Sequence, residues 1–330
     1  MQYMELGDSG LKVSRIAFGS MSIVANPTYS GVEETQAIEA IHTAYDAGIN
    51  FFDTAPGYGN GAAEVVLGRA LAGGLREKVI VADKINTPSL TAQDVETEFA
   101  LACERLNTDY IDLYQIHWPK NVVPVEETLR AMENLVTSGR VRSLGVSNFG
   151  PVDLTEALGV CSLVSNQIAY NLLNRAPEFE VVEIMLKHNM GMLCYSPIAQ
   201  GLLAGKFSNA DEVPDERART RIFASTRPQA RHSEPGCETE AFEAIAGVRA
   251  VAERVGQSMA DVSIAWLLAQ PTVTSVLVGA SMPEQVKRNA AAADVKLSQQ
   301  DLDELSSITE SVKQILGPNM DVWQTESRIR

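Results

Sequence analysis

Residues 79–117 of the chain read VIVADKINTPSLTAQDVETEFALACERLNTDYIDLYQIH. The stretch begins with the apolar run Val79–Ala82, continues with the amphipathic segment Ala92–Leu106 and ends with the apolar run Tyr110–Ile116. Two short apolar runs separated by a helical pattern predict two parallel strands joined by a helix. Both runs are apolar at consecutive positions, as expected for a parallel sheet that is covered on both faces. The stretch therefore indicates an α/β fold.

The same alternation of apolar runs and helical patterns recurs along the chain. Further candidate strands are Ile16–Phe18, Asn50–Phe52, Arg142–Val146, Leu163–Ile168, Gly191–Tyr195 and Ser275–Val278. Further candidate helices are Thr35–Asp46, Ala63–Leu71, Val125–Ser138, Glu178–Lys187 and Pro283–Ala292, with Gly48, Gly139 and Gly191 expected to end helices before the next strand. Six strands added to the two above make eight, the number that a closed barrel needs.

We therefore expect a single (β/α)8 TIM barrel domain over residues 1–330. Two short β-like pieces, Tyr3–Leu6 and Lys12–Arg15, predict an N-terminal β-hairpin, and an extra helix and tail are expected at the C-terminal end. The segment Gly205–Glu238 has no period and many arginines, which is typical of a mobile loop or of a lid whose arginines close over a ligand. The polar tail Gly317–Arg330 fits a frayed surface tail as well as it fits part of a binding site.

The composition excludes several classes of function. The 330 residues are 45% hydrophobic and 21% charged, which is ordinary for a globular protein. A formal net charge of −15 would repel nucleic acid and anionic membranes, so we expect neither as a partner. The chain shows no signal peptide and no apolar stretch near the ~20 residues of a membrane helix, which predicts a cytoplasmic protein. The cysteines Cys103, Cys161, Cys194 and Cys237 lack metal-ligand spacing, so we expect buried free thiols and no metal site.

Four polar residues stand where TIM barrels place their active sites, at the carboxyl ends of strands. Asp53 follows Asn50–Phe52, Lys84 follows the run that starts at Val79, His117 follows Tyr110–Ile116, and Tyr58 lies in the loop PGYGNG at 56–61. Taken singly, the aspartate could cap a turn, the tyrosine could pack, and the histidine could be a core residue. Lys84 differs, because a lysine at the inner end of an apolar strand is unfavourable without a carboxylate partner, and Asp53 is the candidate partner.

Together the four residues predict a proton donor, Tyr58, whose pKa is set by Lys84 and Asp53. A phenol has a pKa of ~10 and is a poor acid at neutral pH. We expect Lys84 to lower the pKa of Tyr58, and Asp53 to keep Lys84 charged and in place. His117 would then hydrogen-bond the carbonyl oxygen of a substrate. The residues expected to contact the substrate are Tyr58, His117 and Trp118, with Trp323 as a second aromatic candidate.

Two longer stretches surround these residues. The first is GINFFDTAPGYG at 48–59, continued by Glu64, Leu67-Gly68 and Ala70-Leu71. The second is DYIDLYQIHWP at 109–119, followed by EETLRAM at 126–132, GRVR at 139–142 and GVSNF at 145–149. Both resemble signatures of the aldo-keto reductase family. The resemblance implies a (β/α)8 barrel, carbonyl reduction by NAD(P)H, and a catalytic tetrad that matches Asp53, Tyr58, Lys84 and His117.

The resemblance also implies where the cofactor binds. Ser147, Asn148 and Gln167 are similar to the family's carboxamide-binding group, Tyr195 to its nicotinamide-stacking ring, and YSPIAQGLLAGK at 195–206 to its pyrophosphate segment. No GxGxxG motif is present, so a Rossmann fold is not expected. The full set of expected cofactor contacts is Gly19, Ser20, Met21, Asp53, Ser147, Asn148, Gln167, Tyr195, Ser196, Pro197, Ile198, Gln200, Gly201, Leu202, Gly205, Lys206, Gly279, Ala280, Ser281, Gln285, Arg288 and Asn289.

A preference between the two nicotinamide cofactors follows from the predicted helix at Pro283. Gln285, Arg288 and Asn289 fall on one face of it, at i, i+3 and i+4. A helix N-terminus with an arginine nearby suits an adenosine 2′-phosphate, so we expect NADP(H) to be preferred, with NAD(H) as the alternative. In the simpler reading, Lys287 and Arg288 are solvated surface residues.

The sequence departs from the family pattern at three positions: Ala63 replaces a common serine, Ser281 stands where many relatives place a cation, and Asp83 precedes Lys84 where a small or hydroxyl residue is usual. We expect Asp83 to point out of the barrel, because an inward carboxylate would compete with Asp53 for Lys84.

Two functions are compatible with these sequence features. One is an NAD(P)H-dependent oxidoreductase that acts on a small carbonyl or alcohol substrate, and the other is a cofactor-binding regulatory subunit with little turnover, as in family members that serve membrane channels.

Overall fold

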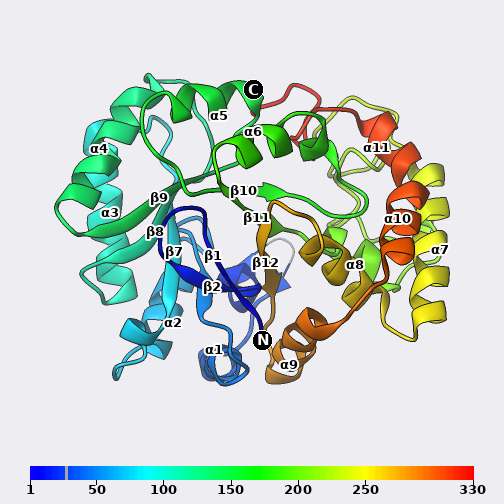
Figure 1. Ribbon diagram of the computed structural model, residues 1–330, viewed down its shortest axis with the longest axis horizontal. Helices are drawn as coiled ribbons and strands as arrows, with labels where there is room; N and C mark the ends of the chain where they lie inside the picture. The colour runs from blue at the N-terminus through cyan, green and yellow to red at the C-terminus, as the bar shows by residue number, and fades with distance from the viewer. Residues whose placement is uncertain (27–28) are drawn as a thin grey trace.

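The centre of the molecule is a closed barrel of parallel strands, which Figure 1 shows surrounded by helices. The computed structural model describes residues 1–26 and 29–330. The barrel strands are β3 (Ile16–Gly19), β6 (Phe51–Asp53), β7 (Ile80–Ile85), β8 (Ile111–Ile116), β9 (Val141–Ser147), β10 (Ser165–Ala169), β11 (Gly191–Tyr195) and β12 (Val273–Gly279). Each strand pairs in parallel with the next, and β12 pairs with β3, which closes the ring. The predicted barrel is confirmed.

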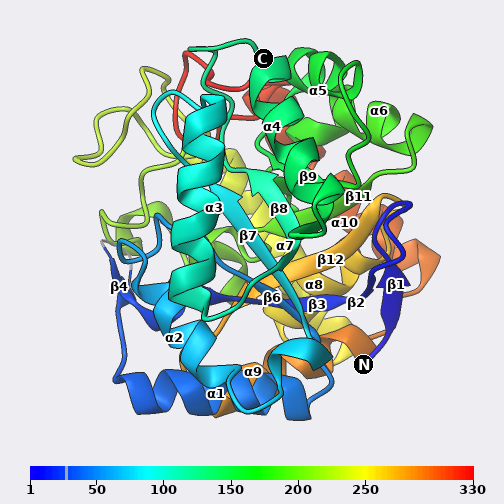
Figure 2. The same cartoon turned by 90° about the vertical axis from the view of Figure 1, so that its left-hand side faces the viewer.

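Helices connect the strands and cover the outside of the barrel (Figures 1 and 2). They are α1 (Glu34–Asp46), α2 (Ala62–Ala70), α3 (Ala92–Leu106), α4 (Val125–Thr137), α5 (Pro151–Leu158), α6 (Val181–Lys187), α7 (Glu238–Val255), α8 (Met259–Leu268), α9 (Pro283–Ala291), α10 (Gln299–Ile308) and α11 (Glu310–Leu316). Short 3-10 turns are η1 (Ser20–Ile23), η2 (Arg76–Lys78), η3 (Ala176–Phe179), η4 (Ala199–Ala204), η5 (Ala210–Glu212) and η6 (Ala292–Asp294). Within residues 1–26 and 29–330, each helix is too short or too polar to cross a lipid bilayer.

Local sequence sets the helix ends. Helix α3 begins with a capping box, in which the side chains of Thr91 and Asp94 each accept a hydrogen bond from the backbone N–H of the other. It ends at Asn107, which adopts φ +50° and so turns the chain out of the helix. Gly48 and Gly139 follow α1 and α4 with φ of +83° and +75°, as expected for helix ends.

The predicted N-terminal hairpin is confirmed as β1 (Tyr3–Glu5) and β2 (Lys12–Ser14), which pair antiparallel. Apolar side chains of this region, including Leu6, Leu11 and Val13, pack against Phe51 and Leu113 in the inner core of the barrel. They close the end at which the strands begin. A second small sheet is formed by β4 (Ala25–Asn26) and β5 (Tyr29–Ser30).

Gly191 was predicted both as the end of a helix and as the first residue of the strand Gly191–Tyr195. The strand is confirmed as β11, whereas the helix end is wrong, because Asn189 with φ +51° makes the left-handed turn after α6. A side chain at Gly191 would lie 2.4 Å from Thr274 Oγ1 and 2.7 Å from Leu6 Cδ1. The position therefore needs glycine for close packing.

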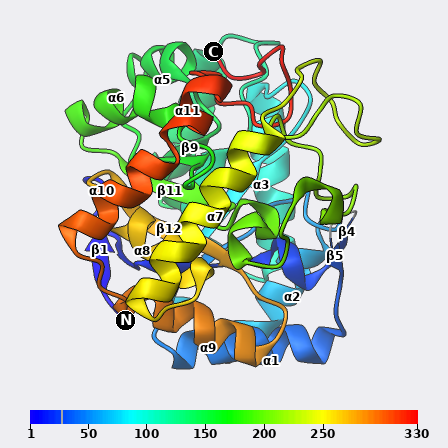
Figure 3. The same cartoon turned by 90° about the vertical axis from the view of Figure 1, so that its right-hand side faces the viewer.

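The tail is docked on the barrel, so the reading of it as frayed is wrong. The backbone oxygen of Arg330 accepts hydrogen bonds from the N–H groups of Val152 and Asp153 at the start of α5, at 3.0 and 3.1 Å. The Arg330 guanidinium also pairs with Asp153 at 2.7 Å. Figure 3 shows the tail passing from α11 to the end of the chain beside α5.

The segment Gly205–Glu238 is anchored by its own arginines. Arg221 pairs with Glu234 at 2.8 Å and donates to the carbonyl oxygens of Leu316 and Asn319, while Arg227 pairs with Glu238 at 3.1 Å. Apolar residues of the segment are buried, among them Val213, Ala218, Ile222 and Phe223. Arg221 and Arg227 are therefore paired within the protein, and closure of the segment over a ligand stays a prediction.

Candidate active site

Lys84 lies at the carboxyl end of β7 and points into the barrel mouth. Its ammonium lies 2.7 Å from Asp53 Oδ1, 2.7 Å from the carbonyl oxygen of Thr54 and 3.4 Å from the Tyr58 hydroxyl. These three partners match the three donors of a lysine ammonium. Burial lowers the pKa of Lys84, but Asp53 and Tyr58 raise it more, so the pKa lies above its ordinary value and the lysine stays charged.

Asp53 ends β6 and joins two parts of the site. Its Oδ1 accepts from Lys84, and its Oδ2 accepts from Gln167 Nε2 at 2.7 Å. Asp53 is almost fully buried, so both of its oxygens depend on these partners. The structure thus links the predicted tetrad to a residue of β10 that the family resemblance assigned to the cofactor.

Tyr58 lies in the loop that follows β6, with its hydroxyl next to Lys84. Its backbone N–H donates to Ala55 O and its carbonyl accepts from Ala63 N–H, which ties the loop to the start of α2. Burial raises the pKa of Tyr58 and the Lys84 charge lowers it, but burial is the larger effect. The effect predicted for Lys84, a lowering of the Tyr58 pKa, is confirmed, but burial of the phenol raises the pKa by more.

His117 follows β8 and faces Tyr58, with the two rings edge to face at 6.1 Å between centroids. Its backbone N–H donates to Ile85 O at 3.0 Å, which fixes the residue against β7. Burial lowers its pKa well below the ordinary value, helped by the charges of Lys84 and Lys120. The imidazole is therefore neutral at physiological pH. Its buried Nδ1 has no hydrogen-bond partner among the described residues.

The expected carboxamide-binding residues form one network. Asn148 adopts φ +60°, donates through Nδ2 to the Ser147 hydroxyl and to His117 O, and accepts from the Tyr195 hydroxyl at 2.8 Å. Ser147 in turn donates to Gln167 O at 2.8 Å. The network therefore connects the ends of β9, β10 and β11 to the residue after β8, and it fixes the Tyr195 ring at the mouth.

The segment after β11 has a backbone suited to an anion. Ser196, Ala199, Gln200 and Gly201 all have positive φ, between +47° and +101°. Turns between right- and left-handed residues point successive N–H groups to one side and favour anions. The expected contacts Pro197, Ile198 and Leu202 belong to the same turn, and Gly205 and the exposed Lys206 follow it.

Arg217 lies over this segment and was not singled out from the sequence. Its Nη1 donates to Gln200 O at 3.1 Å and would lie 2.6 Å from a side chain at Gly201. The glycine therefore makes room for the arginine. No periodic pattern marks Arg217 in the polar run that contains it, so only the fold distinguishes it from its neighbours.

The remaining expected cofactor residues lie at the ends of β3 and β12. Gly19 pairs with Gly279 and with Asp53, so Ser20 and Met21, which follow Gly19, lie at the same end of the barrel as the tetrad. Ala280, which follows Gly279, is buried. At the start of α9, Ser281 N–H donates to Gln285 Oε1 at 2.9 Å, and Asn289 Nδ2 donates to Gly279 O at 3.3 Å. Arg288, one turn after Gln285, is exposed.

Aromatic residues of the tail complete one wall of the mouth. Trp118 and Trp323 lie 6.0 Å apart between ring centroids, and Trp323 stacks on Tyr195 at 6.3 Å with planes 6° apart. Arg328 lies 4.0 Å above the Trp118 ring and pairs with Asp321 at 2.6 Å. The two tryptophans that the sequence proposed as substrate contacts are thus brought together.

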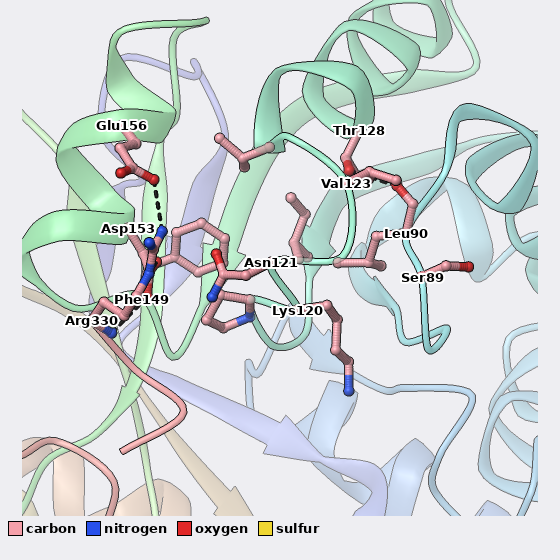
Figure 4. A pocket seen from close by; sticks show the side chains of 13 residues that line it. Ser89, Leu90, Lys120, Asn121, Val123, Thr128, Phe149, Asp153, Glu156 and Arg330 are labelled. Carbon is pink, nitrogen blue, oxygen red and sulfur yellow. Dashed lines mark hydrogen bonds and ion pairs between the residues drawn. The ribbon is translucent and has the colours of Figure 1, made fainter. Parts of the chain in front are cut away.

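Two cavities are lined by residues other than the tetrad. One, of about 340 Å³ including open solvent, is lined by Lys120, Asn121, Phe149 and the Asp153–Arg330 ion pair, and Figure 4 shows Lys120 pointing away from that pair. The other, of about 500 Å³, lies beside the 196–202 segment. It is lined by Ala169, Asn171, Asn174, Ser196, Ala199, Gln200, Leu202, Arg217, Thr220, Arg221, Ile222, Leu316 and Val322.

The cysteines and candidate metal ligands were also located. Cys194 and Cys237 are buried, but Cys103 and Cys161 are only partly buried, so the expectation of burial is wrong for those two. Both lie on helices or turns at the surface of the barrel rather than in strands. Among the described residues, no group of three or more His, Cys, Asp or Glu side chains could hold a metal ion.

Comparison with known proteins adds the following. The sequence model of the aldo/keto reductase family matches residues 15–310. Aldo-keto reductase YhdN of Bacillus subtilis (strain 168) is 31% identical over 341 residues, covering 100% of both chains. The probable voltage-gated potassium channel subunit beta of Oryza sativa subsp. japonica is 30% identical, over 94% of this chain and 97% of its own. Among solved structures, the glycerol dehydrogenase AKR11B4 of Gluconobacter oxydans has a TM-score of 0.82 and 28% identity, covering 96% of this chain and 97% of that one.

Proposed function

Because the chain belongs to the aldo/keto reductase family, we propose that it is an NAD(P)H-dependent oxidoreductase that reduces an aldehyde or ketone, or oxidises the corresponding alcohol, with Tyr58 as the general acid. One observation carries the proposal. The Lys84 ammonium is held between the Asp53 carboxylate at 2.7 Å and the Tyr58 hydroxyl at 3.4 Å. This arrangement places a proton donor beside a buried positive charge that stabilises the phenolate left after proton transfer.

The residues of the site divide the chemistry as follows. Tyr58 holds the proton that passes to the carbonyl oxygen as the alcohol forms, and Lys84 stabilises the phenolate that is left. The neutral His117 can donate one N–H to the same oxygen and so orient the carbonyl. When bound, the nicotinamide supplies the hydride that adds to the carbonyl carbon. Trp118 and Trp323 shield the site on one side.

The residues present fit such a cofactor. The Ser20 and Thr54 hydroxyls are buried at the ends of β3 and β6 without a partner in the described part of the chain, as polar groups awaiting a ligand would be. Ser147, Asn148 and Gln167 would hold the carboxamide, and Tyr195 would stack on the ring. The remaining contacts that we propose are Gly19, Met21, Ser196, Pro197, Ile198, Gln200, Gly201, Leu202, Gly205 and Lys206, with Arg217 added by the structure. The adenosine end would lie at Gly279, Ala280, Ser281, Gln285, Arg288 and Asn289, with NADP(H) preferred.

Replacing the proton donor tests the proposal. Tyr58→Phe keeps the ring and removes the hydroxyl, so turnover should fall by ~10²–10⁴-fold, the usual effect of losing a general acid. Cofactor affinity, followed by quenching of tryptophan fluorescence, should stay at the wild-type value. Tyr45→Phe on α1 is the matched control and should keep full activity. A Tyr58→Phe enzyme with near-normal kcat on a simple aldehyde would refute the role of Tyr58.

A second function has a specific observation in its favour, the 30% identity to a probable channel subunit. A regulatory subunit of the same fold would bind NAD(P)H and turn over little. Consumption of NADPH with a panel of aldehydes and ketones separates the two proposals. Tight cofactor binding without measurable reduction of any compound in the panel would favour the regulatory role.

A further inference from the structure

Asp83 lies directly before Lys84 in β7 but on the opposite face of the strand. Ile80 and Ala82 belong to the inner core of the barrel, whereas Val81 and Ile85 belong to the outer core beneath the helices. Because side chains alternate along a strand, Asp83 points outward, as expected from the sequence. It is completely buried there. Asp83 therefore does not compete with Asp53 inside the barrel.

The outward carboxyl of Asp83 meets a second buried carboxyl, that of Glu64 on α2. Asp83 Oδ1 accepts the Lys84 backbone N–H at 2.8 Å, and Glu64 Oε2 pairs with Arg105 at 3.2 Å. The other oxygens, Asp83 Oδ2 and Glu64 Oε1, are buried and receive no N–H or other donor from the described residues. The two groups lie close enough for the Glu64 charge to raise the pKa of Asp83. Since two carboxylates can only accept, their two unpartnered oxygens are satisfied when one carboxyl carries a hydrogen and donates it to the other.

The surroundings decide which carboxyl is neutral. The charged and titratable groups around the pair are Glu98, Cys103 and Arg105 of α3, Tyr114 of β8, Lys84 of β7, Asp53 of β6 and Tyr58. Arg105 contacts Glu64 and favours its carboxylate, while the Lys84 ammonium is turned inward to Asp53. Burial raises the pKa of Asp83 well above its usual range, and the Glu64 charge adds to this. Burial also raises the pKa of Glu64, to about 7, against the effect of Arg105.

We infer that Asp83 is kept as a neutral acid that donates its hydrogen to Glu64, and that this makes Asp83 and Glu64 positioning residues for the reaction. The inference rests on the proposed role of Tyr58. An ionised Asp83 would add a second negative charge near Lys84 and Tyr58. Held neutral, it leaves Asp53 as the single anion that faces the lysine, so the lysine charge acts on the Tyr58 hydroxyl. The Glu64–Arg105 pair, on α2 and α3 outside the barrel, thus affects the pKa of Tyr58 through Asp83.

Two conservative variants separate the neutral from the ionised state of Asp83. In Asp83→Asn, the amide donates to Glu64 as the acid did, so the pH profile of kcat should keep its wild-type limb for Tyr58. In Glu64→Gln, the amide donates to Asp83 and stabilises its carboxylate. The Tyr58 limb, followed in the alcohol-oxidation direction, should then move up by about one pH unit, the usual size of the effect of a neighbouring like charge on a side-chain pKa. Glu104→Gln, an exposed change on α3, is the control and should leave the limb in place.

A second measurement does not depend on turnover. Infrared difference spectra at neutral pH should show a protonated carboxyl band in the wild-type protein that is missing from Asp83→Asn and from Glu64→Gln. Absence of the band from the wild type would overturn the inference even if the enzyme is active. A band that is present, together with a Tyr58 limb that moves equally in both variants, would overturn the tuning role. Failure of Tyr58→Phe to lose activity would instead refute the proposed function and leave the infrared result standing.

Discussion

Replacing Lys84 with methionine tests whether its charge acts on Tyr58 or only neutralises Asp53. The ammonium lies 3.4 Å from the Tyr58 hydroxyl, and at an effective dielectric constant of ~20 a unit charge at that distance is worth about 5 kcal/mol. As an upper estimate, losing it would raise the pKa of Tyr58 by about 3–4 units. Proton transfer would become unfavourable, so kcat should fall by ~10²–10⁴-fold. Removing one partner of a buried pair should also lower the free energy of unfolding by about 3–5 kcal/mol.

The double variant Lys84→Met/Asp53→Asn separates these effects. It removes both charges, and the amide can still accept from Gln167, whose Nε2 lies 2.7 Å from Asp53 Oδ2 in the wild type. The double variant should therefore be more stable than Lys84→Met alone in urea unfolding, while its kcat stays low. Lys78→Met, an exposed change at the end of η2, is the control and should change neither quantity. A double variant that regained turnover together with stability would show that Lys84 serves only to neutralise Asp53.

Two other predictions follow from the geometry. Arg288→Ala should weaken NADPH binding by roughly 10–150-fold and leave NADH binding nearly unchanged, because a hydrogen bond to a charged group is worth ~1.5–3 kcal/mol. Lys287→Ala, an exposed change at the neighbouring position, is the control and should affect the binding of neither cofactor in fluorescence titrations. An equal loss of affinity for both cofactors would show that Arg288 does not contact the 2′-phosphate. Folding raises the pKa of Glu64 to about 7 from about 4.3 in the unfolded chain, so its contribution to stability is complete below about pH 4.3 and is lost as pH rises through 7. Glu64→Gln should flatten this part of the curve of unfolding free energy against pH, and a curve of unchanged slope would contradict the shift.

The fold was predictable because the pattern that specifies it is local. Each barrel strand is buried on both faces, so each appears in the sequence as a short apolar run, and the helices between them keep an amphipathic period. The tetrad was predictable for a related reason. A lysine at the end of a buried apolar strand needs a carboxylate partner. Parallel strands place their carboxyl ends at the same end of the barrel, so Asp53 at the end of one strand can pair with Lys84 at the end of the next.

Contacts between distant elements were not predictable in this way. Gly191 has no backbone requirement, and its reason for being glycine is Thr274, more than 80 residues away in the chain. Arg217 stands among several arginines that look alike in sequence, yet Arg221 and Arg227 bind partners in the segment and on α11, and Arg217 alone of the three lies over Gln200. Which arginine has which partner is a property of packing.

The tail shows why polarity alone is a poor guide to order. Its ion pairs use the same residues, Asp321, Arg328 and Arg330, that make the segment appear solvated in sequence. Arg328 lies between its carboxylate and the Trp118 ring at 4.0 Å, an arrangement in which charge and aromatic surface support each other. Because Trp323 stacks on Tyr195, and Tyr195 donates to Asn148, the position of the tail is coupled by direct contacts to the proposed cofactor-binding network. A change in the tail can therefore alter the site without any substitution among the tetrad.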